Sequence, residues 1–167
     1  MIKDLEGFYA EAEPYMALFD AFAKKHDLVG QAQADHLCYK CGSRGTFEQL
    51  RTMFEKAGCW IYQSPITGRT IAYVGLKRPF RTMLGDIRYL ELSDQKPDFT
   101  QRTKFDHVEV YPLHRTYEDM VAELGVSEKV VLEERPHHTT HSVDIGGFLF
   151  RCTVGPLVDK IKATEML

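Results

Sequence analysis

The sequence predicts a single α+β domain, residues 1–167, built from two related sheet modules that follow an N-terminal helix. A chain of 167 residues with 44% hydrophobic residues is long enough for one well-buried domain. The order strand, helix and three strands occurs twice. Asp35-His36-Leu37 returns 71 positions later as Asp106-His107-Val108, and Thr46-Phe47-Glu48 returns 70 positions later as Thr116-Tyr117-Glu118. This recurrence of both order and residues indicates a duplicated module.

The first 30 residues predict a helical segment. Apolar residues recur there at steps of three and four from Leu5 to about His26, as in an amphipathic helix with one buried stripe. Pro14 lies inside the pattern and has no amide hydrogen to donate. We therefore expect the helix to be kinked at Pro14 or split into two.

Each module is expected to contain one helix and four strands. In the first module, residues 31–94, we expect strands at 34–41, 60–63, 70–76 and 87–93 and a helix at 46–57. In the second module, residues 104–155, we expect strands at 105–111, 129–133, 140–145 and 148–154 and a helix at 116–124. A polar linker, 94–104, joins the modules, and Pro156 opens a C-terminal helix within 156–167.

Composition narrows the class of protein. The net charge of -3 and the absence of a basic patch argue against nucleic acid as a partner. No apolar stretch approaches the length needed to cross a membrane, and the N-terminus does not look like a signal peptide. With four cysteines and no secretory signal, we expect a cytoplasmic protein with free thiols.

The alternation of side chains along the strands predicts a shared polar face. In the first strand His36 and the apolar Leu37 point to opposite faces of the sheet, and in the fifth strand His107 and Val108 do the same. The same alternation directs Glu91 to the side of the histidines. Two imidazoles and a carboxylate suit a divalent metal ion. The alternative is a metal-free structural or interaction module, because an open antiparallel sheet often has one solvated polar face.

Three segments resemble the YecM family of small bacterial proteins: 34–36, 89–92 and 106–109. That family is similar to the vicinal oxygen chelate superfamily, which includes glyoxalases and ring-cleaving dioxygenases. The resemblance implies two βαβββ modules in a half-open mixed β-barrel around one divalent metal ion. It also implies His36, Glu91 and His107 as ligands.

The resemblance leaves the fourth ligand position without a carboxylate. That position falls in the last strand, where this chain has Arg151, Cys152 and Thr153. The gap either leaves room for water or substrate at the ion, or means that metal affinity is weak or lost. Two histidines and a glutamate do not select among zinc, manganese, iron, nickel and cobalt.

The expected function is binding of a small oxygen-rich molecule at the metal, by an isomerase, lyase or oxygenase. The alternative is a noncatalytic small-molecule-binding protein that uses the same concave face. Glu109 is the candidate for proton transfer, and Tyr111, His141 and Arg151 are candidates for substrate contact. The expected partner is a small-molecule ligand, and a homodimer is left open.

Overall fold

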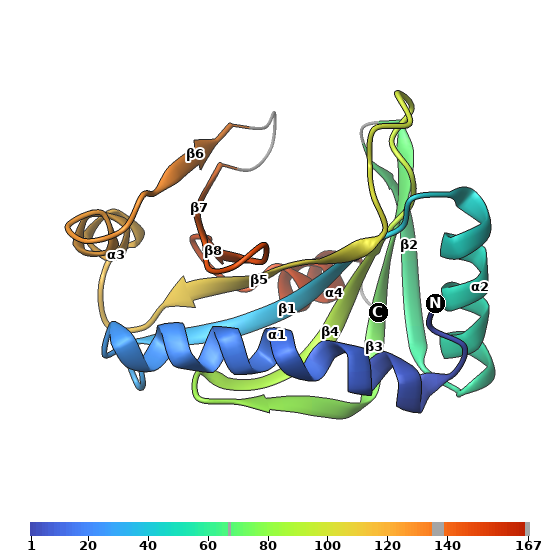
Figure 1. Ribbon diagram of the computed structural model, residues 1–167, viewed down its shortest axis with the longest axis horizontal. Helices are drawn as coiled ribbons and strands as arrows, with labels where there is room; N and C mark the ends of the chain where they lie inside the picture. The colour runs from blue at the N-terminus through green and yellow to red at the C-terminus, as the bar shows by residue number, and fades with distance from the viewer. Residues whose placement is uncertain (67, 135–138, 166–167) are drawn as a thin grey trace.

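The computed structural model describes residues 1–66, 68–134 and 139–165. Its helices are α1 (Leu5–Lys25), α2 (Arg44–Lys56), α3 (Tyr117–Leu124) and α4 (Val158–Glu165). Its strands are β1 (Ala32–Lys40), β2 (Trp60–Ile66), β3 (Arg69–Thr82), β4 (Gly85–Ser93), β5 (Lys104–Pro112), β6 (Val131–Glu133), β7 (Thr140–Asp144) and β8 (Leu149–Cys152). They form one mixed sheet in the order β2-β3-β4-β1-β5-β8-β7-β6 (Figure 1). The predicted α+β fold with a half-open sheet is confirmed.

The two modules meet at the centre of the sheet. β1 pairs with β5 in antiparallel fashion, and these are the strands that carry His36 and His107. Within each module the first strand is parallel to the last: β1 pairs with β4, and β5 pairs with β8. The two halves therefore repeat one topology about the β1–β5 pair, which places both histidines side by side in the middle of the sheet.

Helix α1 is a single element that runs along one face of the sheet (Figure 1). Asp4 caps its N-terminus by accepting a hydrogen bond from the Gly7 amide at 2.7 Å. Pro14 lies inside the helix, so the expected split into two helices is wrong. The missing hydrogen bond is offset by a buried apolar stripe on the sheet: Phe8, Ala12, Met16, Phe19, Phe22 and Ala23. Neither α1 nor another described helix is long and apolar enough to cross a membrane.

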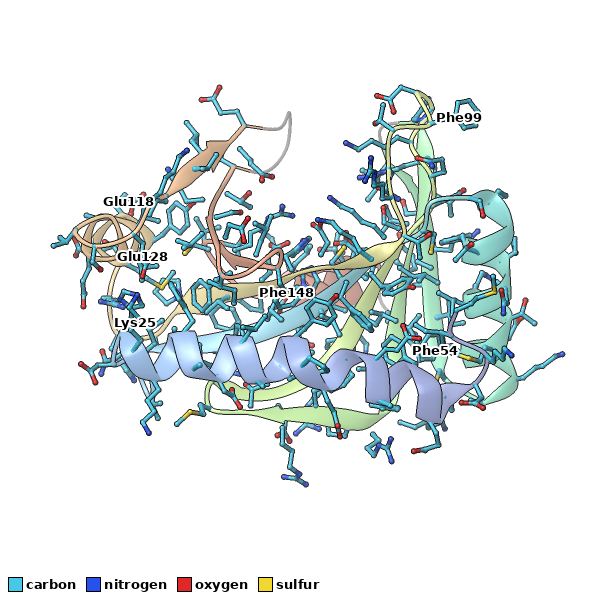
Figure 2. The ribbon with its side chains drawn as sticks, in the orientation of Figure 1. Lys25, Phe54, Phe99, Glu118, Glu128 and Phe148 are labelled. Carbon is cyan, nitrogen blue, oxygen red and sulfur yellow. The ribbon has the colours of Figure 1, made fainter. Side chains whose placement is uncertain are left out.

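The helices divide between the two faces of the sheet. α1, α2 and α3 contribute buried residues to one continuous core, and Figure 2 shows Phe54 and Phe148 directed into it. α4 lies on the opposite face, where Val158 packs against Ile71 and Tyr73. The face that carries the predicted polar residues is therefore partly covered by the C-terminal helix.

Several strand boundaries differ from the expected ones, and three of the differences have a clear structural basis or consequence. β2 continues through Pro65 to Ile66. Proline has no amide hydrogen to donate, but it is tolerated here because β2 is an edge strand, in which backbone nitrogens that face outward need no partner in the sheet. β3 extends to Thr82, because the β3–β4 hairpin resumes its pairing after an irregularity between Gly75 and Phe80. β8 ends at Cys152, and Val154, which was expected on the apolar face, is 69% exposed.

Candidate metal centre

Two β-bulges bring an aspartate to each central histidine. The β1–β5 register shifts between Ala34 and His36, and again opposite His107, so Asp35 and Asp106 are the extra residues. A bulge re-aims the side chains next to it, which allows adjacent residues to meet. His36 Nδ1 lies 2.7 Å from Asp35 Oδ2, and His107 Nδ1 lies 2.8 Å from Asp106 Oδ2. Each carboxylate contacts Nδ1 of its histidine and so fixes the orientation of the ring. A neutral ring that donates from Nδ1 presents the lone pair of Nε2, as in a metal-binding histidine.

The Nε2 atoms of the two histidines converge on Glu109. Glu109 Oε2 lies 3.3 Å from His36 Nε2 and 3.7 Å from His107 Nε2. All three residues are buried, and their ligand atoms lie within 4.8 Å of one another. Glu91 Oε2 approaches the same His36 Nε2 at 3.3 Å. The structure therefore brings together the three predicted ligands and adds Glu109 at the centre.

The cluster is strongly negative and attracts positive charge. Burial lowers the pKa of His36, but Glu109 and Asp35 outweigh it and hold this pKa well above its ordinary value. Burial raises the pKa of Glu91, but the His36 ring, 3.3 Å away, and its positive charge lower it to about 2. Burial likewise opposes ionisation of Asp106, whose pKa is nevertheless lowered far below its usual range by His107 and Lys40. Glu91 and Asp106 therefore stay ionised and attract a cation or a proton.

His36 Nε2 is the atom that best fits a bound cation. It is buried, and it makes no hydrogen bond of good geometry to any described residue, although two carboxylates lie 3.3 Å away. A buried nitrogen without a hydrogen bond is costly unless another partner satisfies it. Imidazole nitrogens and carboxylate oxygens are suitable ligands for a divalent transition metal. The residues present are therefore compatible with the divalent ion that the sequence resemblance implies.

Arg151 lies in the strand that holds the fourth ligand position implied by the resemblance, the position without a carboxylate in this chain. Its Nη1 lies 3.2 Å from His107 Nε2, its Nη2 lies 3.1 Å from Glu133 Oε2, and its Nε donates to Ser142 Oγ at 3.2 Å. The guanidinium thus occupies the lone pair that His107 would offer to a metal ion. Metal binding at His107 requires that this contact open.

The register shows how the second module compensates for Arg151. In the first module Glu91 of β4 pairs with Cys38 of β1, and in the second Arg151 of β8 pairs with Glu109 of β5. Glu109 thus occupies the position equivalent to Cys38, and Arg151 the position equivalent to Glu91. Each half still contributes one histidine and one carboxylate, because the carboxylate of the second half lies on the neighbouring strand.

Comparison with known proteins identifies the family. The sequence profile described as YecM protein matches residues 4–144. The chain belongs to the YecM family. Comparison with curated proteins gave no match.

Two solved structures share the fold of this YecM-family chain. Protein EC4020, from structural genomics, is 19% identical over 98% of this chain and 94% of its own, with a TM-score of 0.75. Hypothetical protein BH1468 from Bacillus halodurans C-125 is 11% identical over 75% of this chain and 96% of its own, with a TM-score of 0.53. At these identities the likeness concerns the fold.

The structure does not bring every expected residue of the YecM-family chain to the centre. His141 was expected at the cleft edge, but its ring contacts the hydroxyl of Tyr117 in α3, on the helix-covered face. The alternation along β7 explains this placement, because Ser142 is the residue that reaches Arg151. Tyr111 is half-buried two residues beyond Glu109, and burial and Asp35 raise its pKa.

Sequence reasoning missed the aspartates that orient the histidines. Asp35 and Asp106 precede the two histidines in both copies of the repeat, and this recurrence was the signal that could have revealed them. Tyr73 also contacts the cluster, since its hydroxyl donates to Glu91 Oε2 at 3.5 Å. A single tyrosine on a strand carries no comparable signal.

The lowered pKa of Glu91 predicts a loss of stability in acid. A carboxyl whose folded pKa is depressed stabilises the fold above its unfolded pKa, and this stabilisation disappears as the pH falls through the folded pKa. For Glu91 the interval runs from its ordinary 4.5 down to about 2. Across it, the melting temperature of metal-free wild type should fall more steeply than that of Glu91→Gln. The exposed control Glu13→Gln should lose melting temperature with falling pH as steeply as wild type does, measured by thermal melts. The same dependence of melting temperature on pH in wild type and Glu91→Gln would contradict the assignment.

Proposed function

We propose that this protein binds one divalent metal ion through His36, His107 and Glu109, with Glu91 beside them, and acts on a small oxygen-rich molecule. The observation that carries the proposal is the buried Nε2 of His36, which lies 3.3 Å from two carboxylates and makes no hydrogen bond of good geometry to a described residue. The Asp35 and Asp106 contacts support it, because carboxylate-oriented histidines are typical of metal sites.

The chain's own residues define the chemistry that such a site supports. A bound divalent ion supplies Lewis acidity that polarises a carbonyl or hydroxyl oxygen. Asp35 and Asp106 hold the two rings in place, and the full burial of His36 keeps bulk water from its ring. Glu91, with a side chain 15% exposed, is the carboxylate of the cluster that reaches nearest to solvent and is placed to exchange a proton. These features suit an isomerase, lyase or oxygenase of the vicinal oxygen chelate type.

Metal binding by matched variants tests the proposal. Protein stripped of metal should take up one equivalent of manganese, iron, cobalt, nickel or zinc, measured by calorimetry and elemental analysis. The double variant His36→Gln with His107→Gln should take up none at the centre. His114→Asn changes an exposed histidine with a φ of 59°, which asparagine tolerates, and should bind as wild type does. Equal metal content in the double variant and wild type would disprove the site.

A noncatalytic binding protein is the second candidate, supported by Arg151. Its Nη1 contact with His107 Nε2 at 3.2 Å gives the centre a fixed cation in place of a carboxylate ligand. Such a centre could hold an anionic ligand without turning it over. A bound small molecule recovered chemically unchanged from metal-loaded protein would favour this candidate, and a product would favour the enzyme.

A further inference from the structure

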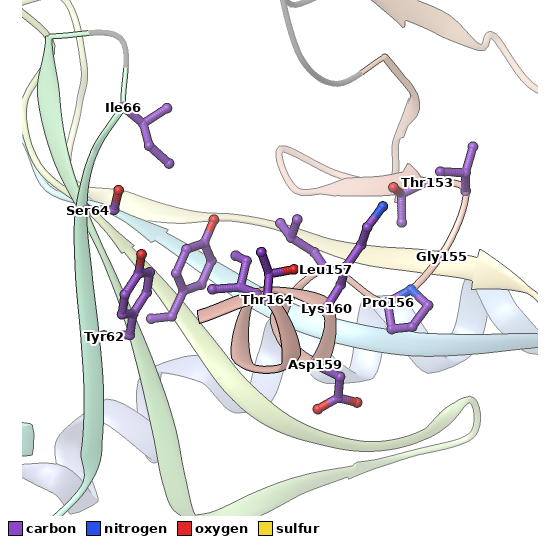
Figure 3. Close-up of a pocket in the computed structure, with 13 residues that line it drawn as sticks. Tyr62, Ser64, Ile66, Thr153, Gly155, Pro156, Leu157, Asp159, Lys160 and Thr164 are labelled. Carbon is purple, nitrogen blue, oxygen red and sulfur yellow. The ribbon is translucent and has the colours of Figure 1, made fainter. Parts of the chain in front are cut away.

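A cleft of about 900 Å³ lies on the face of the sheet that carries α4 (Figure 3). Its walls come from β2, β3, α4 and the segment before α4. The lining residues are Tyr62, Ser64, Ile66, Tyr73, Thr153, Val154, Gly155, Pro156, Leu157, Asp159, Lys160, Ile161 and Thr164. The volume is within the range of cavities that hold small molecules.

The cleft shares a wall with the metal centre. Tyr73 lines the cleft, donates to Glu91 Oε2 at 3.5 Å, and sets its ring edge-on to His36 at 6.2 Å. Leu157 also lines the cleft, and its amide donates to Asp35 Oδ2 at 3.2 Å. A molecule in the cleft would therefore lie one side chain away from the candidate ligands.

The lining combines an apolar interior with one available positive charge. Most of its side chains are apolar or aromatic, and Asp159 and Lys160 are the two charged ones. The Asp159 carboxylate accepts a hydrogen bond from Tyr89 at 3.1 Å, and Figure 3 shows it below α4, on the side opposite to the Lys160 ammonium. Lys160 extends from α4 toward Thr153 in the same view, and no ion pair joins it to a described residue.

The walls of the cleft are held in a fixed relation. Val158 is buried against Ile71 and Tyr73, which anchors α4 on the sheet. A second contact joins α4 to the sheet, because the Lys162 ammonium lies 4.9 Å from the centroid of the Trp60 ring in β2. The cleft is thus a preformed feature between packed elements.

We propose that the cleft binds a small organic anion whose apolar or aromatic body lies between the β2–β3 side and α4, with its carboxylate on Lys160. The pairing follows from the chemistry of the walls. Apolar side chains favour the body, and the Lys160 ammonium, which has no ion-pair partner among the described residues, favours one negative charge. The further statement that this anion is the substrate of the metal centre rests on the proposed function. Binding in the cleft does not.

The test uses 2-naphthoate and its neutral analogue 2-naphthamide as probes on metal-free full-length protein, with affinities measured by calorimetry. Wild type should bind the carboxylate roughly three- to five-fold more tightly than the amide, the size expected of a solvent-exposed ion pair. Lys160→Gln should abolish this preference and leave amide binding unchanged. Lys24→Gln removes an exposed charge on α1 and should keep the wild-type preference.

Filling the cleft supplies an independent arm. Ser64→Trp places a large ring in the lining and should weaken both probes at least about tenfold. Equal affinity of wild type for the two probes, or unaltered binding by Ser64→Trp, would overturn the proposal. Metal titration separates the two ideas: one ion bound per chain without naphthoate binding overturns the cleft alone, and naphthoate binding without metal uptake overturns the metal centre alone.

Discussion

Glu109→Gln is expected to weaken divalent metal binding by at least about 100-fold, and by more than Glu91→Gln. The reason is position: Glu109 Oε2 lies 3.3 Å from His36 Nε2 and 3.7 Å from His107 Nε2, so one carboxylate serves both histidines. Of the two histidines, Glu91 forms a close contact only with His36. Loss of a group that only orients a ligand already costs roughly 10- to 100-fold in affinity, and removal of a ligand should cost more. Competitive titration with a chromophoric chelator measures the order of the two variants.

Glu133→Gln is the matched control for Glu109→Gln. It makes the same chemical change in a residue that contacts Arg151, with Oε2 3.1 Å from Nη2. Its affinity should stay closer to wild type than that of Glu109→Gln. If Glu91→Gln proved the most damaging of the three, the ligand set would be the one expected from the sequence, His36, Glu91 and His107, with Glu109 outside it.

Phe8→Ala is expected to lower the free energy of unfolding by about 3–5 kcal/mol, the range for truncating a fully buried phenylalanine. The Phe8 ring is fully buried, with ring centroids 5.1 Å from Phe54 in α2, 5.9 Å from Phe80 in β3 and 5.6 Å from Phe105 in β5. It therefore joins the N-terminal helix to both modules. Removal leaves a cavity where three aromatic rings meet.

Phe99→Ala is the control for Phe8→Ala. Phe99, labelled in Figure 2, lies in the segment between β4 and β5. It is 82% exposed, so its truncation should change stability by less than about 0.5 kcal/mol. Urea denaturation followed by circular dichroism gives both values. A loss below about 1 kcal/mol for Phe8→Ala would mean that α1 contributes little to the stability of the sheet.

The features of the fold that the sequence predicted depend on repetition and on two-residue alternation. The recurrence of Asp-His in the two modules predicted two equivalent strands, and these strands are neighbours, β1 and β5. Alternation placed His36, Glu91 and His107 on one face, and the structure brings the three together. Both signals can be recognised in the sequence itself, without knowledge of the tertiary structure.

The features that the sequence did not predict depend on contacts between distant segments. A bulge adds one residue to a strand and breaks the alternation, so the positions of Asp35 and Asp106 could not be read from a period of two. The pairing of Arg151 with Glu109 depends on the register of β8 against β5. The place of α4 depends on Val158 meeting Tyr73, which lie far apart in the chain.

The hydrogen bonds of the two aspartates make each half of the molecule dependent on the other. Asp106, in the second half, is paired with Lys40 of the first, Nζ to Oδ2 at 3.0 Å. Asp35, in the first half, accepts the amide of Leu157, which follows the second half in the chain. Lys104 of the second half pairs with the other oxygen of Asp106, Nζ to Oδ1 at 3.2 Å. Each histidine is thus oriented by a carboxylate that also contacts a residue from outside its own half, so the paired imidazoles are a property of the joined chain.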